Sequence, residues 1–359
     1  MRILIFNWKD INNPEAGGAE VFTHEISKRL VKKGHEVTLF TSQFKGSQKE
    51  EIVDGVRIVR DGGKISVYLK AKQHYKKVFS KEGYDVVIDE INTRPFFVHK
   101  FVTNGEKVFA LIHQLAREYW FHETRFPINY IGYYFLENRW LRQYTEIPTI
   151  TISESTRKDL IEMDFKKIFL IPEGLGFKPL KKIPKKADKP VVIFVGRLKK
   201  AKRPDHAIEA FKIIKETIPE AELWIVGEGY FRKKLQKKLV QGVKFFGHVP
   251  EKKKFELLKK AWVLINPSVR EGWGINVIEA NSVGTPCVAY DVPGLRDSVL
   301  NGETGMIVNS GSNELAETII PILNDYKLRR RISKNALTYS KKFNWSKSSE
   351  EFFNIMNGE

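Results

Sequence analysis

Cysteine and long apolar runs are scarce in this sequence, and acidic residues are outnumbered by basic ones. Its 359 residues include a single cysteine, Cys287, which excludes an internal disulfide. This cysteine stands in the apolar run 286–289, which predicts a small buried side chain. No apolar run approaches the roughly 20 residues that cross a bilayer, and the opening 1–4 leads into a strand pattern without the layout of a signal peptide. These absences favour a cytoplasmic protein.

An excess of basic residues, mostly lysine, gives the chain a strong positive charge. Lysine and arginine number 61 against 43 aspartates and glutamates, which gives a formal net charge of +18. Such a charge fits binding to nucleic acid, attraction to an anionic membrane surface, or a lysine-rich surface that only faces solvent. Composition leaves these three interpretations open.

A tight dinucleotide-binding turn is also absent. The first apolar run, 3–6, is followed by a long loop that carries Gly17 and Gly18. A helical pattern over 21–33 comes next and ends at Gly34, a typical position for a glycine after a helix. The spacing G-x-G-x-x-G does not occur in this loop, so the glycine pair needs another explanation.

Short β-branched runs alternate with helical patterns along the whole chain, as in parallel sheets covered by helices on both faces. The basic, proline-containing segment 177–190 predicts an exposed linker between two such halves. We therefore predict an α/β protein with two Rossmann-like domains, at 1–175 and 190–342, facing each other across a ligand-binding cleft. Strands are expected at 3–6, 35–40, 56–59, 85–88, 108–112 and 149–152, and then at 191–195, 223–226, 243–246, 262–265 and 287–290.

Two carboxylates and two glycines stand together at 266–280, where a strand pattern runs into a helical pattern. Gly272 and Gly274 allow a ligand to approach the backbone closely, and the free N–H groups at a helix start favour phosphate. Glu271 and Glu279 have seven residues between them. They would meet different hydroxyls of one extended ligand, since carboxylates only accept hydrogen bonds. The alternative is an ordinary loop and helix with surface acids.

Cations follow the first strand of the second half. Arg197, directly after Gly196, offers a planar fork for phosphate oxygens, and Lys202 adds a point charge. These groups suit the charge that develops on a diphosphate leaving group. In the first half, His113 ends the strand at 108–112, where its side chain is expected to face the cleft; a purely structural histidine is the alternative.

Patterns that bind metals are missing. Neither Asp-x-Asp nor H-E-x-x-H occurs, and the eight histidines show no clustered spacing. We therefore expect that the protein requires no metal and no cofactor.

These motifs together resemble the glycosyltransferases of GT-B fold in the large retaining family 4. The acid pair Glu271 and Glu279 resembles the family's signature, and Gly196 and Arg197 with Lys202 resemble its phosphate-binding pair. The resemblance spans nearly the whole chain.

Weaker parts of the same resemblance lie elsewhere. Gly17 and Gly18 resemble the family's N-terminal glycine loop, and His113 resembles its cleft histidine. The tail 343–359 resembles the segment that crosses back to the first domain. The loop 291–297 departs from the commoner family pattern, and we assign it no catalytic role.

The resemblance implies a hexosyltransferase that uses a nucleotide-diphosphate sugar and retains the anomeric configuration. Arg197 and Lys202 would hold the diphosphate, and Glu279 would hold the ribose. Glu271 would touch the transferred sugar, and His113 would contact that sugar near the reacting centre. The other residues implied to approach the donor through their backbone are Gly17, Gly18, Gly196, Gly272, Trp273, Gly274 and Ile275.

Aromatic and basic residues interleave at 118–140, a composition that suits a surface lying in a lipid interface. A helix pair packed into the first domain is the alternative. With the excess of lysine, this stretch supports a glycan or lipid-linked acceptor and a location at the cytoplasmic face of an anionic membrane.

Two other functions remain open at this point. A nucleotide-sugar epimerase on the same fold would use the donor without an acceptor. A basic nucleic-acid-binding protein would use the net charge, since aromatic and basic residues together can stack on bases. We expect no specific nucleic-acid partner, because the motifs predict a cleft whereas charge alone gives only loose, salt-sensitive binding.

Overall fold

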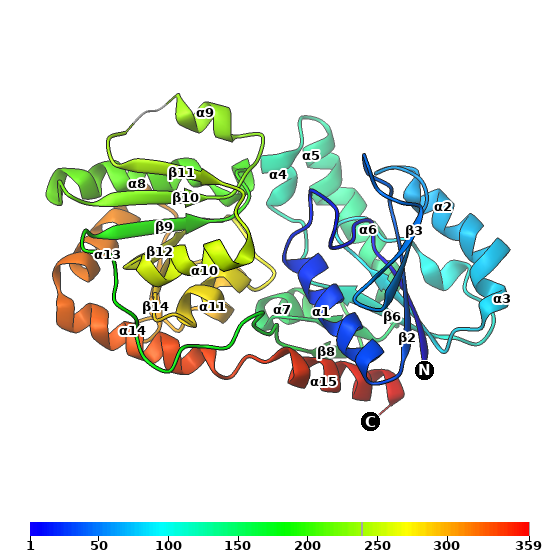
Figure 1. The fold of residues 1–359 in the computed structure, drawn as a ribbon. Coiled ribbons are helices and arrows are strands. Elements are labelled where there is room, and N and C mark those ends of the chain that lie inside the picture. The colour runs from blue at the N-terminus through cyan, green and yellow to red at the C-terminus, as the bar shows by residue number, and fades with distance from the viewer. Residues whose placement is uncertain (238–239, 359) are drawn as a thin grey trace. The chain divides into compact units, whose positions relative to one another are not determined.

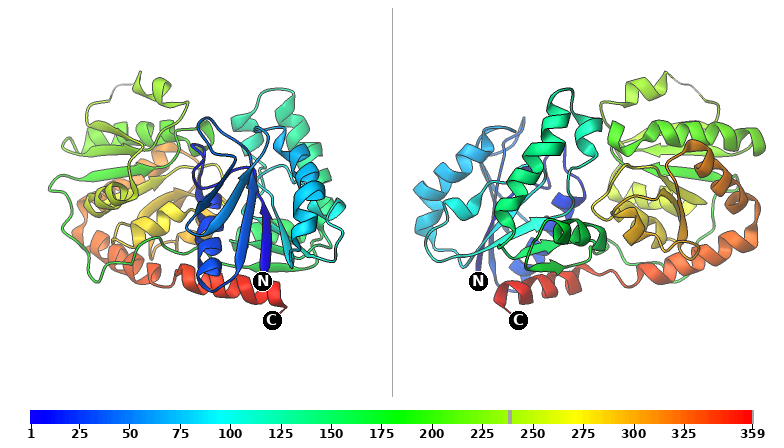
Figure 2. Two further views of the ribbon diagram at one scale, coloured as in Figure 1. Left: turned by 45° about the vertical axis from the view of Figure 1, so that its right-hand side comes forward. Right: turned by 180° about the vertical axis from the view of Figure 1, so that it is seen from behind.

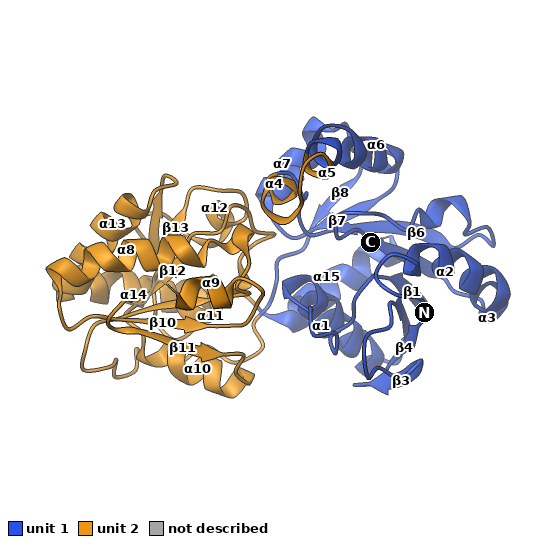
Figure 3. Ribbon diagram, turned by 90° about the horizontal axis from the view of Figure 1, so that it is seen from above, with its two compact units in different colours: residues 1–117, 130–174, 344–359 blue, residues 118–129, 175–343 orange. Residues whose placement is uncertain are grey.

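The computed structural model describes residues 1–237 and 240–358, which form two compact units. Unit 1 comprises residues 1–117, 130–174 and 344–359, and unit 2 comprises residues 118–129 and 175–343 (Figure 3). The predicted first domain ran without a break to residue 175. The structure instead assigns 118–129 to unit 2, and within that unit Glu118 accepts from Arg270 and Glu123 accepts from the backbone nitrogen of Ala201.

Unit 1 is built on an eight-stranded sheet with the order β3-β4-β2-β1-β5-β6-β7-β8 (Figure 1). Neighbouring strands pair in parallel, except that the edge strand β3 runs antiparallel to β4. The strands are β1 (Arg2–Phe6), β2 (Glu36–Thr41), β3 (Glu50–Val53), β4 (Val56–Arg60), β5 (Val86–Glu90), β6 (Lys107–Ile112), β7 (Thr149–Thr151) and β8 (Ile168–Leu170).

The first helix of unit 1 shows how its elements pack. In α1 (Gly18–Lys32), Phe22, Ile26 and Leu30 recur every four residues and are buried, so one face of the helix lies against the core. Gly34 adopts φ +90° just after the helix, as the sequence predicts. The other helices are α2 (Val67–His74), η1 (Tyr75–Phe79), α3 (Ser80–Glu82), η2 (Val98–Lys100), η3 (Gly132–Leu136), α6 (Glu137–Leu141), η4 (Arg142–Tyr144), α7 (Glu154–Glu162) and α15 (Trp345–Asn357), with α5 (Ile128–Ile131) at the boundary between the units.

The last helix of the chain, α15, lies beside the first (Figure 2). The ring of Phe22 makes edge contacts with Trp345 and Phe352 at centroid distances of 5.7 and 6.3 Å. A Cβ atom on Gly174 would lie 2.3 Å from the backbone nitrogen of Trp345, so only glycine fits there. The C-terminal helix is therefore an integral part of unit 1.

Unit 2 is built on a parallel six-stranded sheet with the order β11-β10-β9-β12-β13-β14. Its strands are β9 (Val191–Val195), β10 (Glu222–Val226), β11 (Val243–Gly247), β12 (Val263–Asn266), β13 (Cys287–Tyr290) and β14 (Gly305–Val308). Its helices are α4 (Tyr119–Glu123), η5 (Lys200–Lys202), α8 (Pro204–Thr217), α9 (Arg232–Gln236), α10 (Glu251–Lys260), α11 (Ile275–Asn281), α12 (Leu295–Ser298), α13 (Ser312–Asn324) and α14 (Tyr326–Ser340).

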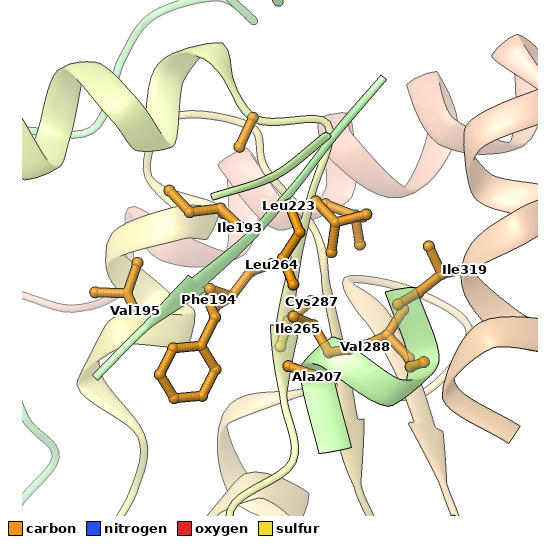
Figure 4. Packing of buried hydrophobic residues seen from close by; sticks show 14 of the residues in the cluster. Ile193, Phe194, Val195, Ala207, Leu223, Leu264, Ile265, Cys287, Val288 and Ile319 are labelled. Carbon is orange, nitrogen blue, oxygen red and sulfur yellow. The ribbon is translucent and has the colours of Figure 1, made fainter. Parts of the chain in front are cut away.

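One large core fills unit 2 between its sheet and its helices (Figure 4). Ile193 and Leu264 come from adjacent strands, and Ile319 of α13 joins the same cluster. Cys287 is fully buried among these apolar side chains and makes no disulfide, as predicted. Burial raises the pKa of its thiol, which makes it a packing residue without nucleophilic character.

The predicted strands all occur, within one or two residues at each end. The sequence analysis missed β3, β8 and β14. The predicted linker 177–190 has exposed lysines and also packs along unit 2: Lys186 Nζ donates to Thr285 Oγ1 at 2.6 Å, and the backbone nitrogen of Ala187 donates to the carbonyl of Lys260 at 2.9 Å. In the described parts of the chain, no helix combines the length and apolar character that crossing a bilayer requires.

Candidate active site

A lysine and a glutamate from separate loops of unit 2 form an ion pair. Lys202 Nζ lies 2.5 Å from Glu271 Oε2, and their side chains are 15% and 13% exposed. The other carboxylate oxygen of Glu271 accepts a hydrogen bond of 2.7 Å from Ser268 Oγ. Burial lowers the pKa of Lys202, but the carboxylate of Glu271 outweighs it, so the pKa lies above that of an ordinary lysine. The ammonium is therefore held charged.

The loop after β9 brings a second cation to this place. Arg197 stands five residues before Lys202, and repulsion from its guanidinium opposes the rise in the pKa of Lys202. The loop is held by close backbone contact with Gly227, where a Cβ atom would lie 1.9 Å from the carbonyl oxygen of Gly196. Two like charges kept together suit an anionic ligand such as a diphosphate.

The turn that carries Glu271 leads into α11. Gly274 precedes the helix with φ +91°, a conformation that favours glycine. Asn276 Nδ2 donates to the carbonyl of Val195 at 2.7 Å, which ties the start of the helix to the end of β9. Trp273 is buried against Phe343, so its indole acts as a packing group. The structure thus brings the predicted residues 271–275 and the predicted cations into one region of unit 2.

Glu279 lies two turns further along the chain, on α11. Its carboxylate accepts from Lys254 Nζ at 2.8 Å, and the same ammonium lies 2.8 Å from Glu251. Burial raises the pKa of Glu279, and the ammonium of Lys254 opposes that rise. Because one oxygen faces Lys254, the carboxylate has a fixed orientation from which to accept hydrogen bonds from a ribose.

A short segment of the chain that the sequence analysis did not connect with this site contacts it directly. Glu118 Oε2 accepts from Arg270 Nε at 2.7 Å, and the Tyr119 hydroxyl donates to the carbonyl of Arg270 at 3.3 Å. The ammonium of Lys202 also lies 5.9 Å from the centre of the Tyr119 ring. The two hydrogen bonds join residues 152 and 151 positions apart in sequence, so no local sequence pattern predicts them. Glu118 and Tyr119 fix the backbone next to Glu271.

The loop after β13 also supports Glu271, although the sequence analysis gave it no role. The backbone nitrogen of Glu271 donates to the carbonyl of Pro293 at 3.1 Å. A Cβ atom on Gly294 would lie 2.2 Å from the carbonyl oxygen of Glu271, and Gly294 has φ +82°. The left-handed glycine therefore lets this loop close onto the predicted catalytic turn.

In unit 1, His113 follows β6 and faces Glu90 at the end of β5. Its Nε2 lies 3.2 Å from Glu90 Oε1, and Glu90 Oε2 accepts from Thr23 Oγ1 at 2.6 Å. The ring is 4% exposed and makes an edge contact with Phe22, but its Nδ1 has no hydrogen-bond partner. An oriented imidazole with one unsatisfied nitrogen is suited to a ligand hydroxyl.

The glycine pair lies at the start of α1 in unit 1. Gly17 is the N-cap with φ −149°, an extended conformation that any residue adopts, and its N–H donates to Glu20 Oε2 at 2.6 Å. Glu20 in turn lies 3.2 Å from Lys9, with both side chains buried. The conformation of Gly17 thus does not itself demand glycine, and the predicted contact of Gly17 and Gly18 with a donor stays a prediction.

The predicted residues divide between the units. His113, Gly17 and Gly18 belong to unit 1, and the remaining predicted site residues belong to unit 2. Across residues 1–237 and 240–358, no three histidine, cysteine, aspartate or glutamate side chains are grouped so that they could hold a metal ion.

Comparison with known proteins identifies the family. Residues 16–175 match the family described as Glycosyltransferase Family 4, and residues 178–338 match Glycosyl transferases group 1. An uncharacterized glycosyltransferase of Methanocaldococcus jannaschii is 22% identical over 93% of this chain and 92% of its own length. The poly(glycerol-phosphate) alpha-glucosyltransferase of Bacillus subtilis is 26% identical over 74% of this chain, but only 43% of its own length is spanned.

Solved structures show the same fold. Sucrose-phosphate synthase from Thermosynechococcus elongatus superposes with a TM-score of 0.85 at 21% identity, over 99% of this chain and 98% of its own. The Anabaena protein HepE in complex with UDP-glucose superposes with a TM-score of 0.76 at 17% identity, over 100% of both chains. The chain therefore belongs to the group 1, family 4 glycosyltransferases and has the GT-B fold of two Rossmann-like domains.

Proposed function

We propose that the protein moves a hexose from a nucleotide-diphosphate sugar to a hydroxyl of a glycan or lipid-linked acceptor, with retention of the anomeric configuration. The observation that carries this proposal is the Lys202–Glu271 ion pair, with Arg197 five residues before Lys202 in the chain. The carboxylate can accept from sugar hydroxyls while the two cations face the diphosphate. HepE, which shares the fold, is described in complex with UDP-glucose, and this supports a nucleotide sugar as donor.

The chemistry assigned to these residues is charge stabilisation. The bond between the sugar C1 and the diphosphate oxygen breaks, and both electrons leave with the oxygen. The acceptor oxygen bonds to C1 on the same face, and its proton passes to the leaving phosphate. Lys202 and Arg197 offset the negative charge that develops on the diphosphate. Glu279 holds the ribose, and His113 holds a hydroxyl of the transferred sugar.

A thermal-shift screen with UDP-, GDP- and ADP-sugars tests the donor. A ligand that binds only the folded protein must raise its melting temperature. One of these donors is expected to do so in the wild type and to fail in Lys202→Ala. No shift with any of them, up to millimolar concentration, would overturn the donor assignment. The family match gives no support to an epimerase or to a nucleic-acid-binding protein.

An anionic membrane surface is part of the same proposal, because unit 1 exposes an aromatic ridge. We call Tyr130, Ile131, Tyr134 and Phe135 with Arg139 and Arg142 the aromatic ridge; all six are exposed, and Phe135 is 69% exposed. They follow one another at helical spacing, with the apolar side chains first and the arginines after them. Aromatic rings flanked by arginine suit the interface of an anionic bilayer.

Co-sedimentation with vesicles tests the ridge. Tyr134→Ser with Phe135→Ser is expected to lower binding to phosphatidylglycerol-containing vesicles severalfold at low salt, whereas Ile52→Ser, an exposed isoleucine of β3, serves as the control. Equal binding by both variants would remove the ridge from the proposal. The cytoplasmic location stays a prediction.

A further inference from the structure

A carboxylate that the proposed function does not use holds the turn that carries Lys202. Glu123, the last residue of α4, accepts through Oε1 from the backbone nitrogen of Ala201 at 3.0 Å. Its Oε2 accepts from the Tyr230 hydroxyl at 3.0 Å, and that hydroxyl accepts from the backbone nitrogen of Lys200 at 3.0 Å. We call these three hydrogen bonds the Glu123 bridge. One carboxylate thus holds two consecutive N–H groups of the turn, one directly and one through a tyrosine.

The turn itself supplies no partner for these two N–H groups. Inside η5 and at its end, the backbone nitrogen of Lys202 donates to the carbonyl of Lys199, and that of Arg203 donates to the carbonyl of Lys200, at 3.1 and 3.0 Å. The N–H groups of Lys200 and Ala201 come too early in the turn for such bonds. Arg203 has φ +45°, a conformation that a non-glycine residue keeps only where its surroundings fix it. The turn therefore depends on partners outside it.

The Glu123 bridge also reaches the segment that carries Glu271. The carbonyl of Ala201 accepts from the backbone nitrogen of Val269 at 3.0 Å, and Ala201 is fully buried. Its peptide groups are thus held on one side by Glu123 and on the other by Val269. Lys202 is the next residue after Ala201, and Glu271 stands two residues after Val269. A displacement of Ala201 would therefore change the distance between the two members of the ion pair.

Tyr230 lies in a loop that is fixed against the loop after β9. The backbone nitrogen of Phe231 donates to the carbonyl of Leu198 at 3.0 Å, and that of Leu198 donates to the carbonyl of Glu228 at 2.8 Å. The side chain of Tyr230 is 58% exposed, so burial of its ring contributes little to stability. Its hydroxyl both accepts and donates, so the hydrogen bonds on this side of the bridge point in one direction and strengthen each other.

A negative charge is not what a site for a diphosphate requires at this place. A carboxylate bonded to the residue before Lys202 repels an anionic ligand, and the N–H groups that it occupies are of a kind that binds phosphate. Geometry explains it, since a carboxylate has two accepting oxygens and the bridge offers two donors. The two explanations differ in sign. Loss of a competing anion would strengthen donor binding, whereas loss of a positioning group would weaken it.

We propose that Glu123 is a positioning residue of the donor site, which fixes the turn that presents Lys202 to the diphosphate. This inference rests on the proposed function and deepens it with a residue that lies far from the donor motifs in sequence. In this role Glu123 touches no reacting atom and acts through the backbone. Glu118, five residues earlier, bonds to Arg270 beside Glu271. The segment 118–129 therefore holds the backbone next to both members of the ion pair.

Donor binding and donor hydrolysis by the full-length protein test the bridge. Water is the acceptor in hydrolysis, so the natural acceptor is not needed. The wild type is titrated with UDP-glucose, GDP-glucose and ADP-glucose, and the tightest binder is used throughout. Glu123→Ala should weaken its binding about threefold and lower the kcat of hydrolysis about tenfold or more, because a misplaced cation loses more in the transition state than in the ground state. Glu123→Gln keeps an accepting oxygen and should lose less.

A second variant removes only the other arm of the bridge. Tyr230→Phe keeps the exposed ring, so the fold is retained, and should lower kcat about threefold. Its combination with Glu123→Ala should cost no more than Glu123→Ala alone, because both act through one chain of hydrogen bonds. The matched control is Glu220→Ala, which removes an exposed glutamate before β10, at the opposite end of that strand from Tyr230. It should change neither quantity, and the melting temperatures of all variants show that they are folded.

Several results would overturn the inference. One is donor binding by Glu123→Ala that is as tight as that of the wild type or tighter. Another is an equal loss in Glu123→Gln and Glu123→Ala, which would assign the effect to charge. A third is an unchanged kcat in Tyr230→Phe, or full additivity in the double variant. Failure of the proposed function looks different, since the wild type itself would then bind none of the three nucleotide sugars.

Discussion

The ammonium of Lys202 lies 2.5 Å from the carboxylate of Glu271, and the two groups reach each other from loops 69 positions apart. Each charge holds the other in place, while Ser268 and Tyr119 fix their surroundings. We expect Lys202→Ala and Glu271→Ala each to lower the transfer rate at least about 100-fold, because both groups act on charge or contacts at the reacting centre. Steady-state rates of purified variants measure this.

The controls for this pair separate charge loss from unfolding. Lys200→Ala removes an exposed cation of the same 3₁₀ turn and should change the rate less than about threefold. Lys202→Met with Glu271→Gln removes both charges, and should regain the melting temperature that the single variants lose while remaining inactive. Near-normal rates in folded single variants would refute the assignment.

Glu279 and Glu251 share the ammonium of Lys254, which gives a matched pair for a test of ribose binding. Glu279→Gln should weaken binding of UDP, or of whichever nucleotide proves active, about tenfold, because a charged acceptor of a hydroxyl is lost. Glu251→Gln should leave affinity unchanged, since its side chain is mostly exposed. Isothermal titration calorimetry measures the nucleotide affinity of each variant. Equal affinities for Glu279→Gln and Glu251→Gln would contradict a contact between Glu279 and the ribose.

His113 is expected to act on transfer and not on nucleotide affinity, because it lies in unit 1 with Glu90 and Thr23. His113→Ala should lower kcat about 10- to 100-fold and leave the dissociation constant of the nucleotide unchanged. Glu90→Gln, which keeps the shape but weakens the orientation of the ring, should give a smaller loss. The control is His35→Gln, which removes a different histidine of unit 1, one whose ring stacks on Phe353 of α15. If nucleotide binding alone fell in His113→Ala, the proposed role would be wrong.

Gly294 provides a structural prediction about the catalytic turn. An added Cβ would lie 2.2 Å from the carbonyl oxygen of Glu271, and φ is +82°. Gly294→Ala should therefore cost about 2 kcal/mol or more of stability and displace Glu271. Gly302→Ala is the control: Gly302 has φ +78° and open space around its Cβ position, so alanine there causes backbone strain but no steric clash. A larger loss of activity in Gly302→Ala than in Gly294→Ala would contradict the argument.

Stability is expected to depend on pH through Asp89, which is fully buried in unit 1. Burial raises the pKa of Asp89 from 3.8 to about 6, although the Tyr144 hydroxyl and the N–H groups of Phe96 and Val98 oppose the rise. Between these values the folded state keeps a proton that the unfolded state has lost. The free energy of unfolding therefore falls as pH rises from about 4 to about 6, by about 3 kcal/mol at most, and this contribution is flat above that range.

Urea unfolding of the wild type and of Asp89→Asn at several pH values measures this effect. The variant cannot titrate at this position, so the difference between the two proteins should change across the window from pH 4 to 6. Parallel pH profiles would show that Asp89 keeps an ordinary pKa.

Much of the fold could be predicted because β-branched runs and helical spacing are local signals. The strands that were missed are short and carry few such signals: β3 is Glu50–Val53 with two leading acids, and β14 begins at Gly305. Charged or glycine-bearing edge strands take their structure from pairing with a neighbour.

The candidate site was predictable only where its residues share a motif. Glu271 and Glu279 were found by their spacing, and Lys202 by its place after a strand. The sequence analysis did not find Glu118, Tyr119 and Gly294. Their role depends on contacts with Arg270 and Glu271 that form only once the chain has folded.

The packing of α15 on α1 has a consequence for inheritance and for engineering. Exchange of the sugar-donor half with that of another family member, by one crossover near residue 175, would bring in a foreign C-terminal helix to cover Phe22 and Gly174. The C-terminal residues 344–359 must therefore come from the same parent as the first half of the chain. The segment 118–129 must come from the same parent as the second half. A working chimera of this protein requires four junctions, which makes its two halves poor modules for recombination.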